Sequence, residues 1–293
     1  MRVINIKNEI NFAEMVSKKK KEKKFIDIKE LIRSKNPKLL RWLPGFVILY
    51  LKRILHQKEL NYFLSNNIEK YNFDFCHAAI DYFNIKINFN GVENIPKQGS
   101  VVLAMNHPLG GMDGVAFISA IQKHRSDIKF IVNDLLMNID NLKGLFVGVN
   151  KHGKNDQRTH DNIDDLFLSE QAVCIFPAGL VSRKVNGKVR DLMWKKTFVL
   201  LGKKYNRDVI PIHIDGKLSN FFYRLSNLRK KMGIKANIEM LYLADEMYKQ
   251  KNKEMTFTIG KPISLNQLSQ ENPKLNDKQL AGLIYKKLYE LEQ

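Results

Sequence analysis

Short apolar runs alternate with longer amphipathic segments along the chain from residue 85 onward. The short runs have the length of strands, and the longer segments repeat apolar residues at helical spacing. Strands that alternate with helices are typical of an α/β fold with a mostly parallel central sheet flanked by helices. The predicted strands are 85–89, 100–105, 128–132, 145–149, 172–176, 209–214, 237–243 and 255–259. The predicted helices are 112–122, 162–169, 194–204, 218–230 and 277–290.

Residues 1–84 show a different pattern: apolar residues recur at helical spacing, and Lys and Arg are in marked excess. We expect a solvated lysine-rich arm at 17–24, followed by helices at 25–34 and 39–56. The second helix carries large apolar side chains beside cations, which suits a membrane interface and equally suits packing on a domain core. The predicted division is therefore a basic, helical membrane-interface extension over 1–84 and an α/β domain over 85–293.

The net charge narrows the choice of partners. Lys and Arg number 49 against 30 Asp and Glu, a formal charge of +19. Such a charge attracts polyanions, either nucleic acid or an anionic lipid leaflet. The sequence has no recognisable helix-turn-helix, aromatic RNA-binding or zinc pattern. Its N-terminal cations are also interleaved with large apolar residues, so we expect an anionic membrane surface and no nucleic acid as partner.

The remaining composition points to a cytoplasmic protein. Cys76 and Cys174 are far apart and lack the spacing of a zinc site or a disulfide framework, so we expect no metal. Residues 1–14 lack the continuous apolar region of a signal peptide. The longest apolar stretch, 42–51, is shorter than the roughly 20 residues that a spanning helix needs. We therefore expect a peripheral protein on the inner face of the cell membrane.

The candidate chemistry begins where the predicted strand 100–105 ends. Asn106 and His107 follow it directly, and Asp113 comes after a turn that contains Gly110 and Gly111. The carboxyl ends of strands in α/β sheets are where ligands bind. A neutral imidazole can accept a proton there, and a carboxylate beside it fixes the tautomer and stabilises the imidazolium. The sequence therefore predicts His107 as a general base with Asp113 as its partner.

This segment resembles the signature of the glycerolipid acyltransferases, the superfamily of lysophosphatidic acid acyltransferase, in which four residues separate the His from the Asp. Here five intervene, and Gly110 and Gly111 can absorb the extra residue as a small bulge. A second family block, Phe-Pro-Glu-Gly followed by Ser or Thr and Arg, corresponds to residues 176–183, with Ala178 in place of the acid. The residues of both blocks resemble those of one branch of the superfamily. This branch includes O-acyltransferases of ornithine-type and glycine-type aminolipids and proteins labelled hemolysins.

The resemblance implies an O-acyltransferase that moves a fatty acyl group from acyl carrier protein or acyl coenzyme A to the hydroxyl of a lyso-lipid. The acceptor is a lyso-aminolipid or lysophosphatidic acid, and no bound cofactor is needed. Backbone N–H groups around Gly110, Gly111 or Gly179 are candidate donors to the oxyanion. The substrate-binding residues that the resemblance implies are Asn106, Gly110, Gly111, Phe176, Pro177, Gly179, Ser182 and Arg183.

Two other activities are compatible with parts of the sequence. The same His and Asp acting on water would make a thioester hydrolase. Residues 148–155 fit a phosphate-binding loop except that Asn155 replaces the Ser or Thr that binds magnesium, so nucleotide hydrolysis is disfavoured. A serine esterase is also disfavoured, because no Ser lies in a G-x-S-x-G elbow.

Overall fold

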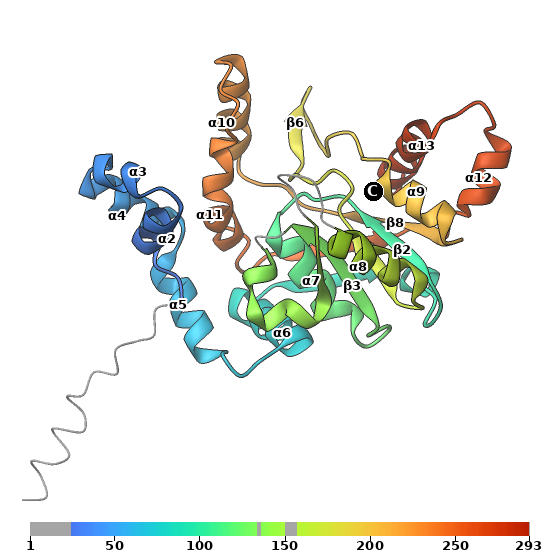
Figure 1. Cartoon of the computed structure of the whole chain (residues 1–293), viewed down its shortest axis with the longest axis horizontal. Coiled ribbons are helices and arrows are strands. Elements are labelled where there is room, and N and C mark those ends of the chain that lie inside the picture. Colours follow the sequence, from blue (N-terminus) through green and yellow to red (C-terminus); the bar gives the residue numbers. More distant parts are fainter. Residues whose placement is uncertain (1–24, 134–135, 150–156, 293) are drawn as a thin grey trace, which may run out of the picture. The chain divides into compact units, whose positions relative to one another are not determined.

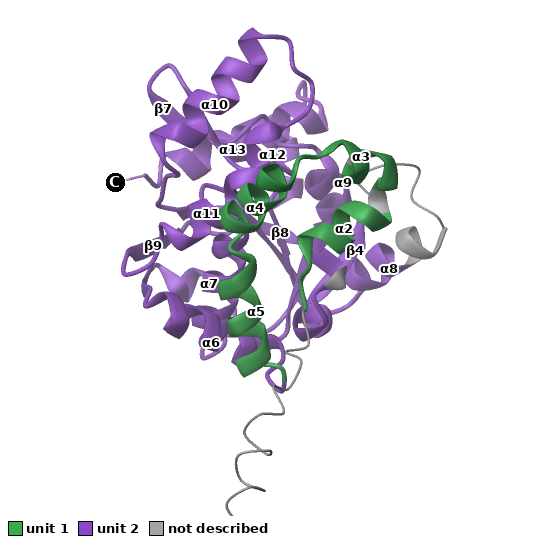
Figure 2. Cartoon of the chain, turned by 90° about the vertical axis from the view of Figure 1, so that its left-hand side faces the viewer, with its two compact units in different colours: residues 1–68 green, residues 69–293 purple. Residues whose placement is uncertain are grey.

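The computed structural model describes residues 25–133, 136–149 and 157–292, and the chain divides into two compact units, 1–68 and 69–293 (Figure 2). The lysine arm at 17–24 and most of the phosphate-loop-like segment, 150–155, lie outside the described residues. In the described residues of the first unit, the chain forms four helices in succession. They are α2 (Ile28–Lys35), α3 (Pro37–Trp42), α4 (Gly45–Ile54) and α5 (Gln57–Asn66).

The predicted helix 39–56 is wrong as a single element, because α3 ends at Trp42 and α4 begins at Gly45. Pro44 lies at the break with a ψ of 147°. Proline disfavours helical backbone at the residue before it and has no N–H to donate, so the chain restarts after it. Within the described ranges, no helix is long and apolar enough to cross a membrane.

The second unit is built on a seven-stranded sheet in the order β1-β9-β8-β2-β5-β3-β4 (Figure 1). Its pairs are parallel except that of β8 with β9, which confirms the predicted α/β class with a mostly parallel sheet. Every residue of the central β2 is buried. The strands are β1 (Lys86–Asn90), β2 (Val101–Met105), β3 (Ile128–Asn133), β4 (Phe146–Val149), β5 (Ala172–Ile175), β8 (Asp208–Ile214) and β9 (Glu254–Ile259).

Helices cover both faces of this sheet. On one face, α8 (Gln157–Leu168), α9 (Thr197–Lys204), α12 (Leu265–Glu271) and α13 (Asp277–Tyr289) share a core with Val102 of β2. Ile131 of β3 packs against that core. Successive side chains alternate across a strand, so Phe130 lies on the other face. There its ring meets Phe117 of α7 (Gly111–Ile121).

Helix α6 (Asn72–Phe83) belongs to the second unit, which begins at Glu69, earlier than the predicted start of the α/β domain at residue 85. It packs on α7 and buries six apolar side chains. Its His77 is also hydrogen-bonded to Ser119 and Gln122 of the α7 segment. A helix of the basic N-terminal sequence is thus part of the sheet domain.

The predicted strand 237–243 is wrong. The segment forms the 3₁₀ helix η4 (Ile238–Tyr242), which leads into α11 (Leu243–Tyr248). Glu239 within it is fully buried against Arg183 and Arg229. An interaction between residues so distant in sequence overrides the local apolar pattern. The pattern also did not predict α12 or the antiparallel hairpin of β6 (Arg183–Val185) and β7 (Lys188–Arg190).

The other elements complete the second unit. Helix α10 (Asn220–Lys231) matches the predicted helix 218–230 closely. Short 3₁₀ helices occur at η1 (Val92–Asn94), η2 (Leu136–Asn138) and η3 (Asp140–Leu145). The last of these runs directly into β4, so the predicted strand at 145–149 begins one residue later than expected.

Candidate active site

Asn106 fixes the chain where it leaves β2. Its side-chain oxygen accepts the N–H of Ile214 at 2.6 Å, and its amide nitrogen donates to the Ile214 carbonyl at 2.9 Å. These two bonds continue the pairing of β2 with β8 beyond Met105. The Asn106 amide, predicted to bind substrate, is therefore engaged within the protein and sets the position of the next residue, His107.

His107 and Asp113 meet as the sequence predicts. Nδ1 of His107 lies 2.9 Å from Oδ2 of Asp113, and the Asp113 carboxylate also accepts the N–H of Leu109. The carboxylate is fully buried, whereas the imidazole remains partly exposed. With Nδ1 engaged, Nε2 is the ring nitrogen that can exchange a proton with a substrate. Burial raises the pKa of Asp113, and the hydrogen bond from His107 opposes that rise.

Gly110 accommodates the extra residue between His107 and Asp113. This residue has a φ of 71°, a backbone conformation in which other residues are strained, and its carbonyl accepts the N–H of Asp113 at 3.0 Å. Helix α7 begins at the next residue, Gly111, and places Asp113 in its first turn. The first N–H groups of a helix have no partner within it, so those of Gly111 and Met112 lack an intrahelical acceptor.

Phe176 stacks on the imidazole. The two ring centroids are 4.1 Å apart and the planes are inclined by 25°. Phe176 directly follows β5, the strand beside β2, and its ring also lies near Phe130. Pro177 and Gly179 complete the turn: the N–H of Gly179 donates to the Phe176 carbonyl at 3.0 Å. That N–H is thereby occupied within the turn.

Ser182 and Asp191 form hydrogen bonds with the backbone carbonyl and N–H of His107. The N–H of Ser182 donates to the His107 carbonyl at 2.8 Å, and the N–H of His107 donates to Oδ1 of Asp191 at 3.1 Å. The Ser182 hydroxyl donates to the same Asp191 oxygen at 2.5 Å, and Nε1 of Trp194 donates to the other at 2.9 Å. Asp191 is buried, which raises its pKa against these hydrogen bonds.

Asp191 is a residue of this site that no motif in the sequence indicates. It lies outside both family blocks, and its contact with His107 joins residues 84 apart in the chain. Two tyrosines of α13 also hold its backbone: Tyr289 Oη accepts its N–H, and Tyr285 Oη donates to its carbonyl. The only sequence signal is an acid close to a Trp, and such a pair carries no recognisable spacing rule.

Arg183 is directed into the protein. Its guanidinium is 1% exposed, donates to Glu239 at 2.9 Å and to the Val181 carbonyl at 2.5 Å, and lies over the ring of Phe222. Arg183, which the resemblance implied as a substrate-binding residue, thus forms a buried ion pair with Glu239. A different cation lies at the turn: a Cβ built on Gly179 would be 3.4 Å from Nζ of the exposed Lys195.

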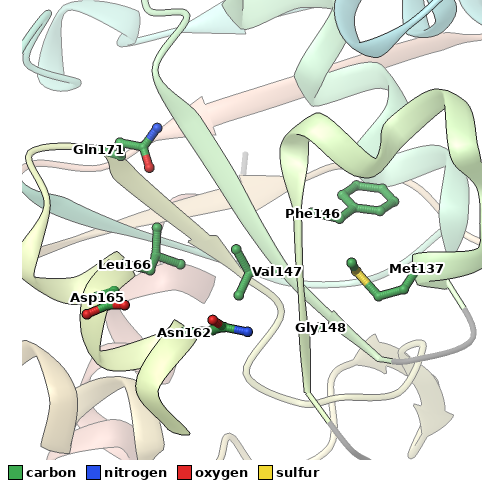
Figure 3. Close-up of a pocket in the computed structure, with 8 residues that line it drawn as sticks. All are labelled: Met137, Phe146, Val147, Gly148, Asn162, Asp165, Leu166 and Gln171. Atoms are coloured by element: carbon green, nitrogen blue, oxygen red, sulfur yellow. The ribbon is translucent and has the colours of Figure 1, made fainter. Parts of the chain in front are cut away.

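A pocket of about 340 Å³ lies elsewhere, along β4 and α8 (Figure 3). Val147 and Leu166 in its lining belong to the core on the α8 face of the sheet. Phe176, which stacks on His107, contacts Phe130 on the opposite face. None of the pocket's lining residues is a predicted site residue, so this pocket is separate from the His107–Asp113 pair. The lining residues are Met137, Phe146, Val147, Gly148, Asn162, Asp165, Leu166 and Gln171.

An imidazole paired with a buried carboxylate thus lies at the carboxyl end of the central strand, and such a pair can exchange a proton with a bound group. The chain belongs to the acyltransferase family, whose sequence model matches residues 30–293. It is an O-acyltransferase, which confirms the resemblance to the glycerolipid acyltransferase superfamily and to its aminolipid branch.

Two curated relatives support this placement. The chain is 46% identical over 239 residues to a lyso-glycine lipid O-acyltransferase of Bacteroides thetaiotaomicron, covering 81% of this chain and 88% of the relative. A protein of the same name from Phocaeicola vulgatus is 44% identical, and the match covers 81% of this chain and 86% of that relative. Among solved structures, the 1-acyl-sn-glycerophosphate (LPA) acyltransferase PlsC of Thermotoga maritima matches with a TM-score of 0.48. It is 17% identical, over 83% of this chain and 89% of its own.

Proposed function

We propose that the enzyme transfers a fatty acyl group from an acyl thioester to the free hydroxyl of a lyso-aminolipid, with His107 as general base. The observation that carries the proposal is the 2.9 Å contact of His107 with a buried Asp113, in a chain whose curated relatives are lyso-glycine lipid O-acyltransferases. The donor is acyl carrier protein or acyl coenzyme A, which the reaction uses as a co-substrate.

In this mechanism, Nε2 of His107 removes the acceptor's hydroxyl proton as the oxygen attacks the thioester carbon. Asp113 keeps the Nδ1–H tautomer and stabilises the imidazolium. The tetrahedral intermediate collapses as the carbon–sulfur bond breaks, and the imidazolium returns its proton to the leaving thiolate. The ester and the free thiol are the products, and the enzyme regains its neutral imidazole.

The oxyanion of the intermediate lies, in this proposal, at the start of α7. The N–H groups of Gly111 and Met112 have no acceptor within the helix, and the helix dipole favours negative charge there. Gly110 supports the same role, because its positive φ turns the chain from His107 into the helix within a few residues. Both donors and base then come from one turn between β2 and α7.

The turn within the second family block, residues 176–183, favours an acceptor with an anionic head group. Ala178 occupies the position at which the family carries a carboxylate, so that negative charge is missing here. Lys195 lies beside Gly179 of the same turn and supplies a positive charge. A free carboxylate, as on an N-acylated glycine, fits this combination because it gains an ionic partner and loses a repulsive one. We therefore place the acceptor's head group at Gly179 and Lys195.

The first unit supports work at a membrane. Trp42 and Phe46 are 86% and 72% exposed on α3 and α4, and Leu49 is also exposed. Arg41, Lys52 and Arg53 lie on the same two helices. Aromatic and aliphatic side chains flanked by cations suit the surface of an anionic leaflet. We propose that these helices hold the enzyme peripherally on the inner face of the cell membrane.

The test is an acyl-transfer assay on the purified full chain with synthetic lyso-glycine lipid, lysophosphatidic acid and each class of acyl donor. Mass spectrometry would detect the product, and a thiol reagent would follow donor consumption. We expect an acceptor-dependent product, with preference for the carboxylate-bearing lyso-aminolipid. His107→Ala should lower the rate by at least about 100-fold, the usual contribution of general base catalysis.

Two outcomes of the same assay would contradict the proposal. Donor consumption that is equally fast without an acceptor would establish a thioester hydrolase in place of the transferase. Near-normal transfer by His107→Ala would remove the histidine from the mechanism. His124→Ala is the matched control, because His124 is a partly buried histidine outside the site, and its Nε2–H donates to the Ile95 carbonyl. Its variant should keep the wild-type rate.

A further inference from the structure

Helix α10 of the second unit carries an unusual outer surface. Four large apolar side chains on α10 and the segment after it are exposed, with Leu228 at 54% and Met232 at 65%. The opposite side of the helix buries Phe222, Tyr223 and Ser226. We call the exposed surface the α10 patch. Its apolar members are Phe221, Leu228, Met232 and Leu241.

The charge of the patch has one sign. The sequence of α10 contains no Asp or Glu, and exposed cations lie beside the apolar side chains. Arg229, the remaining cation of the helix, is buried in an ion pair with Glu239 and does not contribute to the surface. The exposed cations of the patch are Arg224, Lys230, Lys231 and Lys235.

The patch is tied to the catalytic loop by a buried cluster. Glu239 pairs with Arg229 of α10 and with Arg183 of β6, and it accepts a hydrogen bond from Ser226. Arg183 directly follows Ser182, whose N–H bonds the His107 carbonyl. The β6–β7 hairpin and α10 lie side by side in both views of the chain (Figures 1 and 2). The hairpin adds the exposed Val185 to the same region.

We propose that the α10 patch is a second membrane-docking surface, which places the His107 loop against an anionic lipid leaflet independently of the N-terminal helices. Charge and chemistry choose the partner. Phosphates and anionic head groups attract the cations, and the acyl region accepts the apolar side chains between them. A second copy of the chain would bring like charges together, and a nucleic acid would leave the apolar side chains in water. The inference rests on the proposed function in one respect, because the enzyme's lipid acceptor must be reached from a leaflet.

The test compares full-length variants in sedimentation with vesicles of phosphatidylcholine alone and of phosphatidylcholine with phosphatidylglycerol. The patch variant is Leu228→Ser/Met232→Ser. Its matched control is Leu168→Ser/Leu200→Ser, which removes exposed leucines from α8 and α9. We expect the patch variant to bind anionic vesicles at least about fivefold more weakly, and the control to bind as wild type.

A variant that removes two charges measures the electrostatic contribution to vesicle binding. Lys230→Gln/Lys231→Gln should weaken binding to anionic vesicles several-fold and leave the weak binding to neutral vesicles unchanged. Equal binding by patch variant, control and wild type would overturn the proposal. Equal weakening by patch variant and control would do the same. Loss of self-association or of DNA retention in the patch variant, with vesicle binding unchanged, would assign the patch to those partners instead. Thermal unfolding verifies that each variant is folded.

Activity distinguishes failure of the patch from failure of the function. With a lyso-lipid embedded in anionic vesicles, the patch variant should be several-fold slower than wild type, whereas both should be equally fast with a lyso-lipid dispersed in detergent. A wild-type chain inactive in both formats would refute the proposed function while the vesicle-binding result on the patch still stands. Equal activity of variant and wild type on vesicles would refute the docking role.

Discussion

His107 is held at three points, and each one fixes a different degree of freedom. Asp113 holds the ring through Nδ1, while Asp191 and Ser182 hold the backbone N–H and carbonyl on its two sides. Phe176 covers one face of the ring. An imidazole restrained in this way loses little entropy when a substrate binds, which suits the proposed role of His107 as general base.

The buried carboxylate of Asp113 makes stability depend on pH. Because burial raises its pKa, the folded state binds its proton more tightly than the unfolded state does. The contribution is therefore fully favourable below the ordinary Asp range near pH 4 and is lost as pH rises through the raised pKa. The free energy of unfolding of Asp113→Asn, relative to wild type, should accordingly increase from pH 4 to pH 8 in urea titrations.

The control for that titration is Asp81→Asn, since Asp81 is an exposed acid of α6. Its difference from wild type should be flat over the same pH range. A difference that moved in the opposite direction for Asp113→Asn would mean that the imidazole outweighs burial and lowers the pKa of this carboxyl group in the folded protein.

Asp191 should act as a positioning residue. In Asp191→Asn, the side-chain NH2 replaces one of the two carboxylate oxygens. If this NH2 faces Nε1–H of Trp194, two donors meet, so the side chain must shift and move the backbone of His107 with it. We expect kcat to fall about 10- to 100-fold, the usual effect of a small displacement of a catalytic group, with the acceptor KM nearly unchanged. Steady-state kinetics on the folded variant measures both.

A second substitution isolates the cause. Trp194→Phe in the Asp191→Asn background removes the competing donor, so part of the lost kcat should return. Trp194→Phe alone should cost stability more than kcat, because the indole is buried in the core. An Asp191→Asn enzyme with wild-type kcat, or one in which only KM changes, would contradict the positioning role.

At the scale of elements, the strands were the most predictable part. Their buried apolar runs are encoded locally, and the carboxyl end of the central strand is a property of the sheet's topology. The segment 237–243 was not predictable in this way, because Glu239 is buried against Arg183, which lies 56 residues away in the chain, and against Arg229 of α10. The break at Pro44 has a local cause that the apolar spacing over 39–56 does not reveal, since proline in a helix interior removes a hydrogen bond and clashes with the preceding turn.

Arg207 is the clearest case of an element held by one side chain. Its guanidinium is buried and donates to the carbonyls of Phe167 and Leu166 at the end of α8, and to those of Ser169, Gln171 and Val101. Arg207→Met leaves these buried carbonyls without their donor. We expect a loss of about 3–5 kcal/mol of unfolding free energy in urea denaturation.

Arg224→Met is the matched substitution on the surface of α10, where the guanidinium is exposed. It should change the unfolding free energy by no more than about 0.5 kcal/mol. A similar loss in both variants would mean that Arg207 stabilises the chain through its charge and not through the five carbonyls.

At the scale of the whole molecule, two sequence blocks about 70 residues apart meet in one site, as expected for neighbouring strands β2 and β5 of a parallel sheet. The His107–Asp113 pair was predictable because both residues lie in one local turn. The inward direction of Arg183 and the contact of Asp191 were not, because each depends on a partner that only the folded chain supplies. The helical, basic character of the first unit was predictable from composition.

The place of β2 in the middle of the sheet has a consequence for how the enzyme fails on heating. The amide of Asn106 acts as one more rung of the ladder between β2 and β8, directly before His107, the proposed general base. A central strand is paired on both sides and separates only when much of the sheet opens, whereas edge strands and chain termini fray first. The base should therefore stay in place through partial melting of the molecule, and catalysis on a detergent-dispersed lipid should persist until cooperative collapse of the sheet.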